Sequence, residues 1–360
     1  MIYRVAIILI NYHDYAKKYL GDCWASLQNL QLTAADFSID KQLFIVDNDS
    51  SSESWSYLEQ AAPGARFLAN KNNDGFAKGN NDALAVALAE GFDFAWVLNM
   101  DTIVTENSLI ELVQAANKYS QAGALQSLLR LWPEQELANS LGNATHFLGY
   151  GYCLGYRQKM SDLDIASLNG QAIAYPSGAS VLLRLTALRQ IGLFDETFWM
   201  YNEDQDLGWR LWLSGWECRL VSTSEVSHKY EFGRSITKYY WLDRNRILAA
   251  WKNYHWLTII LLLPVLVASD LVLAVLAWRA GRLKQKLQAW WFFINPLQWR
   301  KLIKLRWQAQ RLRVRPDRQI VKTFVGRISF QEAGFETKLI ACGNWCLNLY
   351  WQIIKLVIFW

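Results

Sequence analysis

The sequence predicts an α/β protein built on a mostly parallel sheet, followed by a helical, basic C-terminal region. Two observations carry this prediction. Apolar, β-branched runs alternate with helical stretches along the first third of the chain, and beyond about Tyr239 the chain becomes helical, aromatic and basic. Strands that alternate with helices form βαβ units, whose sheet is covered by helices on both faces.

Four apolar runs are the expected strands of the sheet: residues 5–10, 42–46, 65–68 and 94–98. The helical stretches between them are residues 15–30, 53–61 and 79–90. Later in the chain, residues 181–183 are expected to form an apolar strand and residues 203–210 part of a helix. Hydrophobic residues make up 52% of the chain and charged residues 19%, which excludes a disordered polymer.

The N-terminus, MIYRVAIILINY, has a short apolar run with no small-residue cleavage site after it. We therefore expect a buried first strand there, not a signal peptide, and an N-terminal half that stays in the cytosol. The cysteines form no CxxC pair, so buried free thiols in a reducing compartment are expected, and not a zinc site. The five cysteines are Cys23, Cys153, Cys218, Cys342 and Cys346.

Positive charge is concentrated in the C-terminal third. Residues 279–327 hold fourteen Lys and Arg against one acid, Asp317, a net +13 in a chain whose total is +5, so the remainder carries −8. A basic segment rich in Trp indicates a membrane surface or a polyanion as partner. We accordingly expect a first domain over residues 1–238 and a helical, membrane-associated region over residues 239–360.

Residues 256–278 are about long enough to cross a bilayer, but Pro264 and Asp270 interrupt them. A single crossing would also place the basic segment outside the cytosol, against the positive-inside tendency. We therefore expect a broken helical hairpin that dips into the cytoplasmic leaflet, with residues 289–307 and 339–360 as interfacial helices. A buried helical subdomain is the alternative.

Polar residues follow three of the predicted strands at the point where each ends. They are Asn11, the pair Asp47 and Asn48, and the run from Asn99 to Asp101. Helix caps and turns also use such residues. Because ligands of open α/β sheets bind beyond the carboxyl ends of the strands, three polar ends in succession favour a binding site.

Eight motifs in a fixed order extend this pattern over most of residues 1–250. They are VAIILINYHD, LFIVDNDSSS, NNDGFAKGNNDAL, WVLNMDT, YPSGASVLLR, GLFDETFWMYNEDQDLGWRL, SHKYEFGRS and YYWLDRNRIL. The ordered set resembles family-two glycosyltransferases of the rhamnosyltransferase-like group. The resemblance implies a GT-A (Rossmann-like) domain that binds a nucleotide-sugar.

The resemblance places the nucleotide base beside Asp47, whose carboxylate can accept the ring N–H of uracil or thymine, with Asn48 and Asn11 nearby. A turn-capping Asp is the alternative. Residues 73–81, which hold Asn73, Gly75, Lys78 and Gly79, are expected to form a turn that enters a helix beside the donor. Lys78 either contacts a phosphate or is a solvated surface Lys.

The family carries its metal motif, often Asp-x-Asp, where this chain has Asn99-Met100-Asp101. The resemblance implies Mg²⁺ or Mn²⁺ bound by Asp101 and the donor diphosphate. Asn99 is a weaker, neutral ligand, so little metal is expected to bind without nucleotide. His228 matches a family histidine near the metal, although a structural histidine is the alternative.

Three carboxylates, Glu203, Asp204 and Asp206, fall within four positions, and clustering of like charges can raise a carboxyl pKa. The resemblance assigns Asp204, with Glu203 beside it, as the catalytic base that deprotonates the acceptor hydroxyl. These acids also suit a helix N-terminus, and Asp206 and Arg210 are spaced to pair on one helix face. Arg244 is expected to meet the diphosphate, or else to lie on a solvated helix face.

Together these observations predict an inverting glycosyltransferase on the cytoplasmic face of the cell membrane, acting in polysaccharide or cell-wall biosynthesis. The expected donor is dTDP-rhamnose and the expected acceptor a lipid-linked or cell-surface glycan precursor. UDP-galactofuranose or a UDP-hexosamine is the alternative donor, and a catalytically silent membrane scaffold is the alternative class. No nucleic-acid partner is expected, and the sequence does not indicate an oligomeric state.

Overall fold

The computed structural model describes residues 1–230, 236–329 and 338–360. The chain forms two compact units. Unit 1 comprises Met1–Asn143, Cys153–Met200 and Trp216–Glu231, and unit 2 comprises Ala144–Tyr152, Tyr201–Gly215 and Phe232–Trp360. Unit 2 thus takes in two earlier segments that the predicted division at residue 238 assigns to the first domain. That predicted division stays a prediction.

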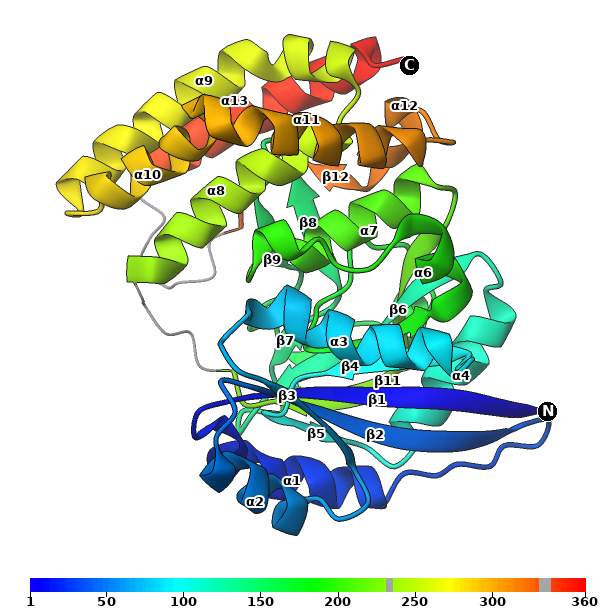
Figure 1. Cartoon of the computed structure of the whole chain (residues 1–360). Coiled ribbons are helices and arrows are strands. Elements are labelled where there is room, and N and C mark those ends of the chain that lie inside the picture. Colours follow the sequence, from blue (N-terminus) through cyan, green and yellow to red (C-terminus); the bar gives the residue numbers. More distant parts are fainter. Residues whose placement is uncertain (231–235, 330–337) are drawn as a thin grey trace. The chain divides into compact units, whose positions relative to one another are not determined.

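Unit 1 is built on one large mixed sheet with the strand order β3-β2-β1-β4-β10-β6-β11-β5, and β7 pairs with β6 (Figure 1). The strands are β1 (Ile2–Tyr12), β2 (Ser38–Asn48), β3 (Arg66–Asn70), β4 (Phe94–Leu98), β5 (Thr102–Val104), β6 (Ala122–Leu131), β7 (Ala138–Ser140), β10 (Ser180–Arg184) and β11 (Glu217–His228). The four strands predicted first, β1 to β4, pair in parallel as expected.

The centre of this sheet is covered on both faces, which is why β1 is continuously apolar. Residues Val5, Ile7 and Leu9 share one core with side chains of α1, α2 and α4, while α3 lies on the opposite face (Figure 1). The helices of unit 1 are α1 (Tyr15–Gln28), α2 (Ser52–Ala61), α3 (Gly75–Ala89), α4 (Ser108–Lys118), α5 (Ile165–Leu168) and α6 (Leu185–Ile191), with short 3₁₀ turns at Met160–Asp162 and Glu196–Phe198.

Several elements of unit 1, among them β6, β11 and α4, were not predicted, and two predicted details differ in the structure. Helix α3 begins at Gly75, before the predicted start at residue 79, because the glycine-containing segment is itself the first turn of the helix. Strand β10 runs antiparallel to both β4 and β6, so the sheet is mixed. An antiparallel strand can join its neighbour without a helical crossover. The strict alternation of strands and helices seen in the preceding βαβ units is therefore not required before β10.

Unit 2 is mainly helical and has an aromatic core. The ring of Trp209 meets Tyr254 and Phe324 edge-on, and Phe147 stacks on Trp351 with ring centroids 4.9 Å apart. Its helices are α7 (Glu203–Leu213), α8 (Ile236–Asn253), α9 (Trp256–Arg279), α10 (Leu283–Ile294), α11 (Pro296–Arg311), α12 (Asp317–Ile320) and α13 (Lys338–Val357), with a 3₁₀ turn at Val321–Thr323. A small sheet joins β12 (Phe324–Val325), β8 (Asn143–His146) and β9 (Gly151–Cys153).

Helix α9 corrects the prediction of a broken hairpin within residues 256–278. It is one continuous helix that contains Pro264, and the chain turns back only after Arg279. Proline removes a single N–H from the helix, and Asp270 is paired with Arg246 and Lys286, so neither residue ends it. By length and composition α9 could cross a membrane, and only 6% of the most apolar stretch of this helix is buried within the structure.

The cysteines are only partly as predicted. None of the five forms a disulfide in the part of the chain that the structure describes, and Cys23 and Cys218 are buried, but Cys342 and Cys346 on α13 are exposed. The prediction of buried thiols was wrong for these two because α13 turns an apolar stripe, which contains them, toward solvent.

Candidate nucleotide-sugar site

The first two strand ends bring Asn11 and Asp47 together. Strands β1 and β2 are in register at these residues, and Asn11 Nδ2 donates to Asp47 Oδ1 at 2.6 Å. Ser54 Oγ donates to Asp47 Oδ2, also at 2.6 Å, so a carboxylate that is only 1% exposed has a donor for each oxygen. Each oxygen keeps a further lone pair with which it can accept an N–H group.

A cleft of about 320 Å³ opens beside this pair. It is lined by Asn11, by the turns after β1 and β2 and by the start of α2. His13 and Asp49, which line it, both have positive φ angles of 51° and 63°. Such left-handed backbone in non-glycine residues is uncommon and clusters at ligand sites.

The segment around the start of α3 is held closely against its neighbours. Gly75 has a φ of +84°, and a Cβ there would lie 2.4 Å from the Trp199 carbonyl oxygen. A Cβ on Gly79 would lie 3.1 Å from Asn48 Nδ2, and that amide donates to the Gly75 carbonyl oxygen at 3.1 Å. Gly75 is therefore required by its backbone conformation and by the close Trp199 carbonyl, and at Gly79 a side chain would press on its neighbours.

The polar side chains of this segment have partners of their own. Asn73 Oδ1 accepts from the Gly75 N–H at 3.1 Å. Lys78 forms an i,i+4 ion pair with Asp82, whose hydrogen bond raises the pKa of the Lys78 ammonium. The Lys78 ammonium is thus paired within the protein and is not a freely solvated surface group.

Asp101 and His228 come together where β5 pairs with β11. The ring nitrogen His228 Nε2 lies 3.3 Å from Asp101 Oδ1, and both side chains are nearly buried. His228 Nδ1 lies 2.9 Å from Asn139 Oδ1, an arrangement in which Nδ1–H is the donor. In a neutral ring Nε2 then presents its lone pair toward a carboxylate oxygen.

The same Asp101 oxygen is buried and has no hydrogen-bond partner among the described residues. Two facing lone pairs are what a shared divalent cation would bind, so Asp101 and His228 fit as a pair of metal ligands. No group of three or more His, Cys, Asp or Glu side chains suited to a metal occurs in the part of the chain that the structure describes. Asn99 follows the end of β4 and precedes Asp101 closely in sequence.

The predicted carboxylate cluster lies at the start of α7, in unit 2. Glu203 is 6% exposed, and burial, with the neighbouring charge of Asp204, raises the pKa of its carboxyl well above 4.5. Asp204 is half-buried and accepts from the Gln205 N–H at 2.7 Å. Two residues just before the helix have positive φ angles, 68° at Tyr201 and 64° at Asn202. Strained backbone therefore leads into this cluster.

Comparison with known proteins identifies the family. Residues 96–303, more than half of the chain, match glycosyl transferase family group 2, and residues 6–160 match glycosyl transferase family 2. The chain belongs to glycosyltransferase family 2. It is therefore a glycosyltransferase, of a family that inverts the anomeric centre.

This family-2 glycosyltransferase is similar to one named in Mycobacterium tuberculosis, N-acetylglucosaminyl-diphospho-decaprenol L-rhamnosyltransferase. The two are 29% identical over 206 residues in both the CDC 1551 / Oshkosh and the H37Rv strains. The match spans 52% of this chain and 66% of the relative, just under two thirds of its length.

A solved structure shows a similar fold at low sequence identity. The crystal structure of GalNAc-T7 with UDP, GalNAc and Mn²⁺ superposes with a TM-score of 0.51 and 12% identity, covering 69% of this chain and 47% of that one. Residues 1–349 of S. aureus TarS cover 90% of this chain with a TM-score of 0.46 and 14% identity, and 84% of that chain is matched. The predicted GT-A-like fold with a C-terminal helical region is confirmed.

Arg244 of the glycosyltransferase is not on a solvated face. It is 4% exposed, and its guanidinium lies over the rings of Trp241 and Phe292 at 4.3 and 4.8 Å from their centroids. Its Nε donates to Asn245 Oδ1 at 2.9 Å. The alternative of a solvated helix face was wrong for this residue, and its meeting with a diphosphate stays a prediction.

The predicted site residues fall into two sets. Unit 1 holds Asn11, Asp47, Asn48, Asn73, Gly75, Lys78, Asn99, Asp101 and His228, and unit 2 holds Glu203, Asp204 and Arg244. Within unit 1 the structure pairs Asn11 with Asp47, and Asp101 with His228. The second half of the SHKYEFGRS motif, residues 231–235, lies outside the described residues.

Three partner residues were missed. Ser54 holds the second oxygen of Asp47, and its signal was present, because it also forms a capping box with Ser51 at the start of α2. Asn139, which contacts His228, lies in a segment without a motif, and no sequence pattern points to it. Lys252 pairs with Asp206 from a distant helix, as described below.

Proposed function

We propose that this enzyme transfers a rhamnosyl group from dTDP-rhamnose to a hydroxyl of a lipid-linked glycan precursor. The observation that carries the proposal is the 206-residue match with a rhamnosyltransferase whose name specifies a decaprenol-linked acceptor. The carboxylates that the chemistry needs, Asp47, Asp101 and Asp204, are all present in this chain.

In this proposal Asp47, with Asn11 and Asn48, accepts the ring N–H of the nucleotide base at the edge of the cleft beside β1 and β2. A thymine or uracil ring offers one such N–H between two carbonyl groups. The support is geometric, because Asn11 and Ser54 fix the orientation of a buried carboxylate that keeps free lone pairs. Asn73, Gly75 and Lys78 then lie along the donor, at the N-terminus of α3, where a helix favours anionic groups.

Asp101 and His228 are proposed to hold Mg²⁺ or Mn²⁺ together with the donor diphosphate, which Asn99 would contact. The support is the unpartnered Asp101 oxygen that faces His228 Nε2. When bound, such an ion neutralises the charge that develops on the leaving nucleoside diphosphate. With two protein ligands in place, the remaining positions suit phosphate oxygens and water.

Asp204 is proposed to act as the general base, with Glu203 beside it. The acceptor hydroxyl loses its proton to Asp204 as its oxygen forms a bond to the anomeric carbon. The bond from that carbon to the phosphate oxygen breaks at the same time, and the nucleoside diphosphate leaves on the opposite side, which inverts the centre. Burial and the neighbouring charge of Asp204 raise the pKa of the Glu203 carboxyl above its ordinary value.

A lipid-linked acceptor requires the enzyme to work at a membrane. We propose the cytoplasmic face, with the helical region from residue 239 attached peripherally or monotopically. The exposed apolar surface of α9 and the basic segment that follows it support this placement. Asp204 belongs to the same compact unit as these helices, which suits an acceptor whose reacting hydroxyl is tethered to lipid.

A panel of nucleotide-sugars tests the proposal. Purified enzyme is mixed with dTDP-rhamnose, UDP-galactofuranose or UDP-N-acetylglucosamine, with Mg²⁺ or Mn²⁺, and release of nucleoside diphosphate is measured with and without a polyprenyl-diphosphate sugar. The expected result is release from dTDP-rhamnose that rises when the acceptor is added. Preference for either UDP-sugar would replace the donor assignment, and release from none of them would support a silent scaffold.

A further inference from the structure

We propose that α9 and α13 form one apolar face that lies in the plane of an anionic lipid surface, with α11 at headgroup level. The inference rests on the proposed work at a membrane and specifies the helices, their orientation and the lipid chemistry. All the residues that carry it belong to unit 2.

The outer side of α9 is a stripe of large apolar side chains with no charge before Arg279. Their spacing of three and four residues keeps them on one side of the helix along its whole length. The exposed members are Trp256, Ile260, Leu263, Val267, Leu271, Val275 and Trp278. A soluble helix normally buries such a stripe, so this one calls for an apolar partner.

The inner side of α9 carries the charge that fixes the helix in place. Asp270 pairs with Arg246 of α8 and with Lys286 of α10, whose ammonium lies 3.0 Å away, and Trp290 donates to it as well. Lys286 is fully buried and also pairs with Asp243 at 2.9 Å. Moving α9 across a bilayer would separate these charges in a medium without water, so the network keeps α9 beside α8 and α10.

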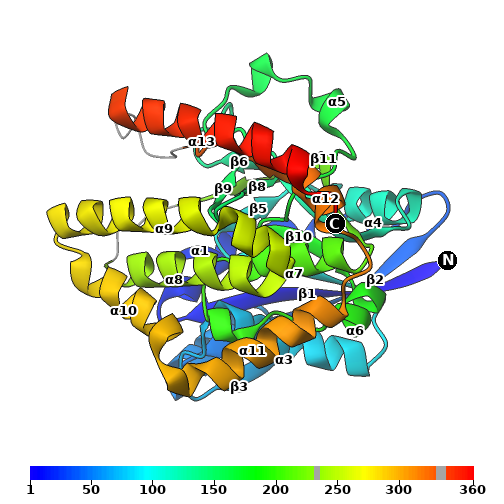
Figure 2. The ribbon, with the colours of Figure 1, turned by 90° about the horizontal axis from the view of Figure 1, so that it is seen from above.

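Helix α13 extends the same face. It runs antiparallel to α9, and Figures 1 and 2 show the two helices side by side. Tyr350 Oη donates to the Leu261 carbonyl oxygen at 3.1 Å, and Trp360 Nε1 donates to Thr258 Oγ1 at 2.8 Å. The exposed stripe of α13 consists of Cys342, Trp345, Cys346, Leu349, Ile353, Leu356 and Val357.

Helix α11 has the composition of a headgroup-level helix. Most of its exposed residues are apolar or positively charged: Leu297, Trp299, Arg300, Lys301, Ile303, Lys304, Trp307 and Arg311. No acidic residue occurs between Asp270 and Asp317. Aromatic rings interleaved with Lys and Arg are typical of surfaces that bind anionic lipid.

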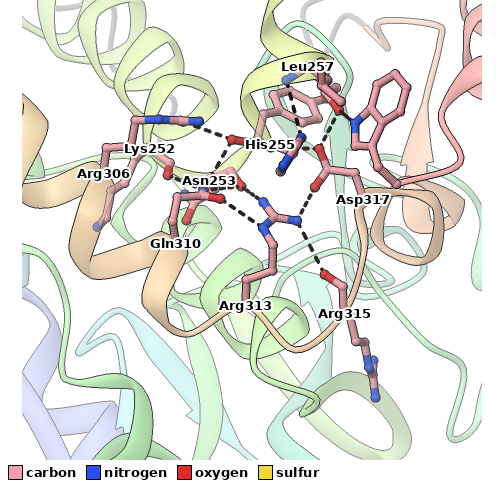
Figure 3. Close-up of polar contacts among 12 residues, drawn as sticks. Lys252, Asn253, His255, Leu257, Arg306, Gln310, Arg313, Arg315 and Asp317 are labelled. Carbon is pink, nitrogen blue, oxygen red and sulfur yellow. Dashed lines mark hydrogen bonds and ion pairs between the residues drawn. The ribbon is translucent and has the colours of Figure 1, made fainter.

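The opposite side of α11 is fixed to the end of α8, as Figure 3 shows. Gln310 Nε2 donates to the carbonyl oxygens of Lys252 and Asn253, and Arg306 and Arg313 donate to carbonyl groups of the same turn. Arg313 also pairs with Asp317. These inward cations cap a helix C-terminus, so only the outward ones on α11 are available to lipid.

The enzyme's own cysteines report on this face. Full-length protein is mixed with vesicles of phosphatidylcholine alone or of phosphatidylcholine with phosphatidylglycerol, then treated with a membrane-impermeant maleimide and analysed by peptide mass spectrometry. We expect binding to be about tenfold stronger with phosphatidylglycerol. Reaction of Cys342 and Cys346 should then fall sharply, while half-buried Cys153, outside this face, reacts as before.

Two variants separate the face from the rest of the molecule. L349E/I353E places charge on the α13 stripe and should weaken vesicle binding by about tenfold or more. The matched control L154E changes an exposed leucine of unit 1 and should bind normally. Both should retain nucleoside diphosphate release from the water-soluble donor, so loss of that release alone would count against the proposed function and not against this face.

Equal reactivity of Cys342 and Cys346 with and without phosphatidylglycerol vesicles would overturn the proposal. So would normal vesicle binding by L349E/I353E. Protection of both thiols without lipid, together with a doubled mass in solution, would show that a second copy of the chain covers the face instead.

Discussion

The Asp206 carboxylate of α7 lies 2.9 Å from the Lys252 ammonium of α8, and both side chains are almost completely buried. Arg210 donates to the same carboxylate at 2.8 Å, and so does Asn253 from the end of α8. The pairing of Asp206 with Arg210 that the sequence predicts is confirmed, but it is one part of a larger network. This network fixes the first turn of α7, which also carries Glu203 and Asp204.

Breaking this network should destabilise the protein strongly. D206N leaves Lys252 and Arg210 buried without their carboxylate, so we expect the free energy of unfolding to fall by about 3–5 kcal/mol. Urea denaturation followed by Trp fluorescence measures it. D206N/K252M removes one uncompensated cation and should recover part of the loss, and a single D206N that unfolds like wild type would contradict the assignment.

Asp204 should matter for turnover and much less for stability. D204N keeps the size of the side chain and removes its basicity, so kcat should fall by roughly a hundredfold or more while donor binding persists. Steady-state transfer assays and calorimetric titration of the donor measure the two effects. D36N, which changes an exposed Asp of unit 1, is the control, and near-normal turnover in D204N would exclude Asp204 as the base.

Burial of Glu203 gives stability a specific pH dependence. Because its pKa is raised in the folded protein, the carboxyl is protonated in both states below 4.5, where its favourable contribution is complete. As the pH rises above 4.5 the unfolded chain loses the proton first, and stability falls until the folded group ionises. E203Q should remove this fall in urea denaturation curves measured across the range, whereas the exposed control E106Q should retain it.

The Asp101–His228 pair predicts metal dependence with a contribution from Asn139. Excess chelator should abolish transfer, and Mn²⁺ or Mg²⁺ should restore it. N139A leaves the two ligands intact but releases the His228 ring, so the metal concentration for half-maximal activity should rise about 10–100-fold. Full activity in chelator would reject the metal, and an unchanged metal requirement in N139A would reject the orienting contact.

Topology mapping tests whether α9 crosses the membrane. Gln308 is exposed on α11, beyond the end of α9. In a chain that carries C153S, C342S and C346S, Q308C should stay unlabelled by an impermeant maleimide in intact cells and react after lysis. A membrane-permeant maleimide is the positive control, and labelling of intact cells would show a true crossing.

Local sequence patterns predicted the first four strands of unit 1 and the three helices between them, but not β6, β11 or α4. The run from Val5 to Leu9 is apolar at every position because both faces of the sheet are covered there, and its strand type follows from that alone. The start of α3 was misplaced because Gly75 and Gly79 favour a turn by local preference. Contacts with Trp199 and Asn48, far away in sequence, explain why both glycines lie within the helix.

Pairings between distant segments explain what sequence reasoning could not reach. Asp270 resembled a helix-breaking charge in an apolar run, and only its partners on α8 and α10 show why the helix continues through it. Asn139 contacts His228 from β7, a pairing set by the order of strands in the sheet. Asp101 and His228, by contrast, were predicted from motifs, and the structure brings them together.

A metal held by only two protein side chains has a thermodynamic consequence for catalysis. If diphosphate oxygens complete the coordination of Asp101 and His228, donor and metal raise each other's affinity by the same factor. The enzyme then binds metal alone or donor alone only weakly. Added metal should lower the apparent Kd for the donor by the same factor as added donor lowers the apparent Kd for the metal. Release of the nucleoside diphosphate would carry the ion away with it, so each catalytic cycle begins with an exchange of metal as well as of sugar.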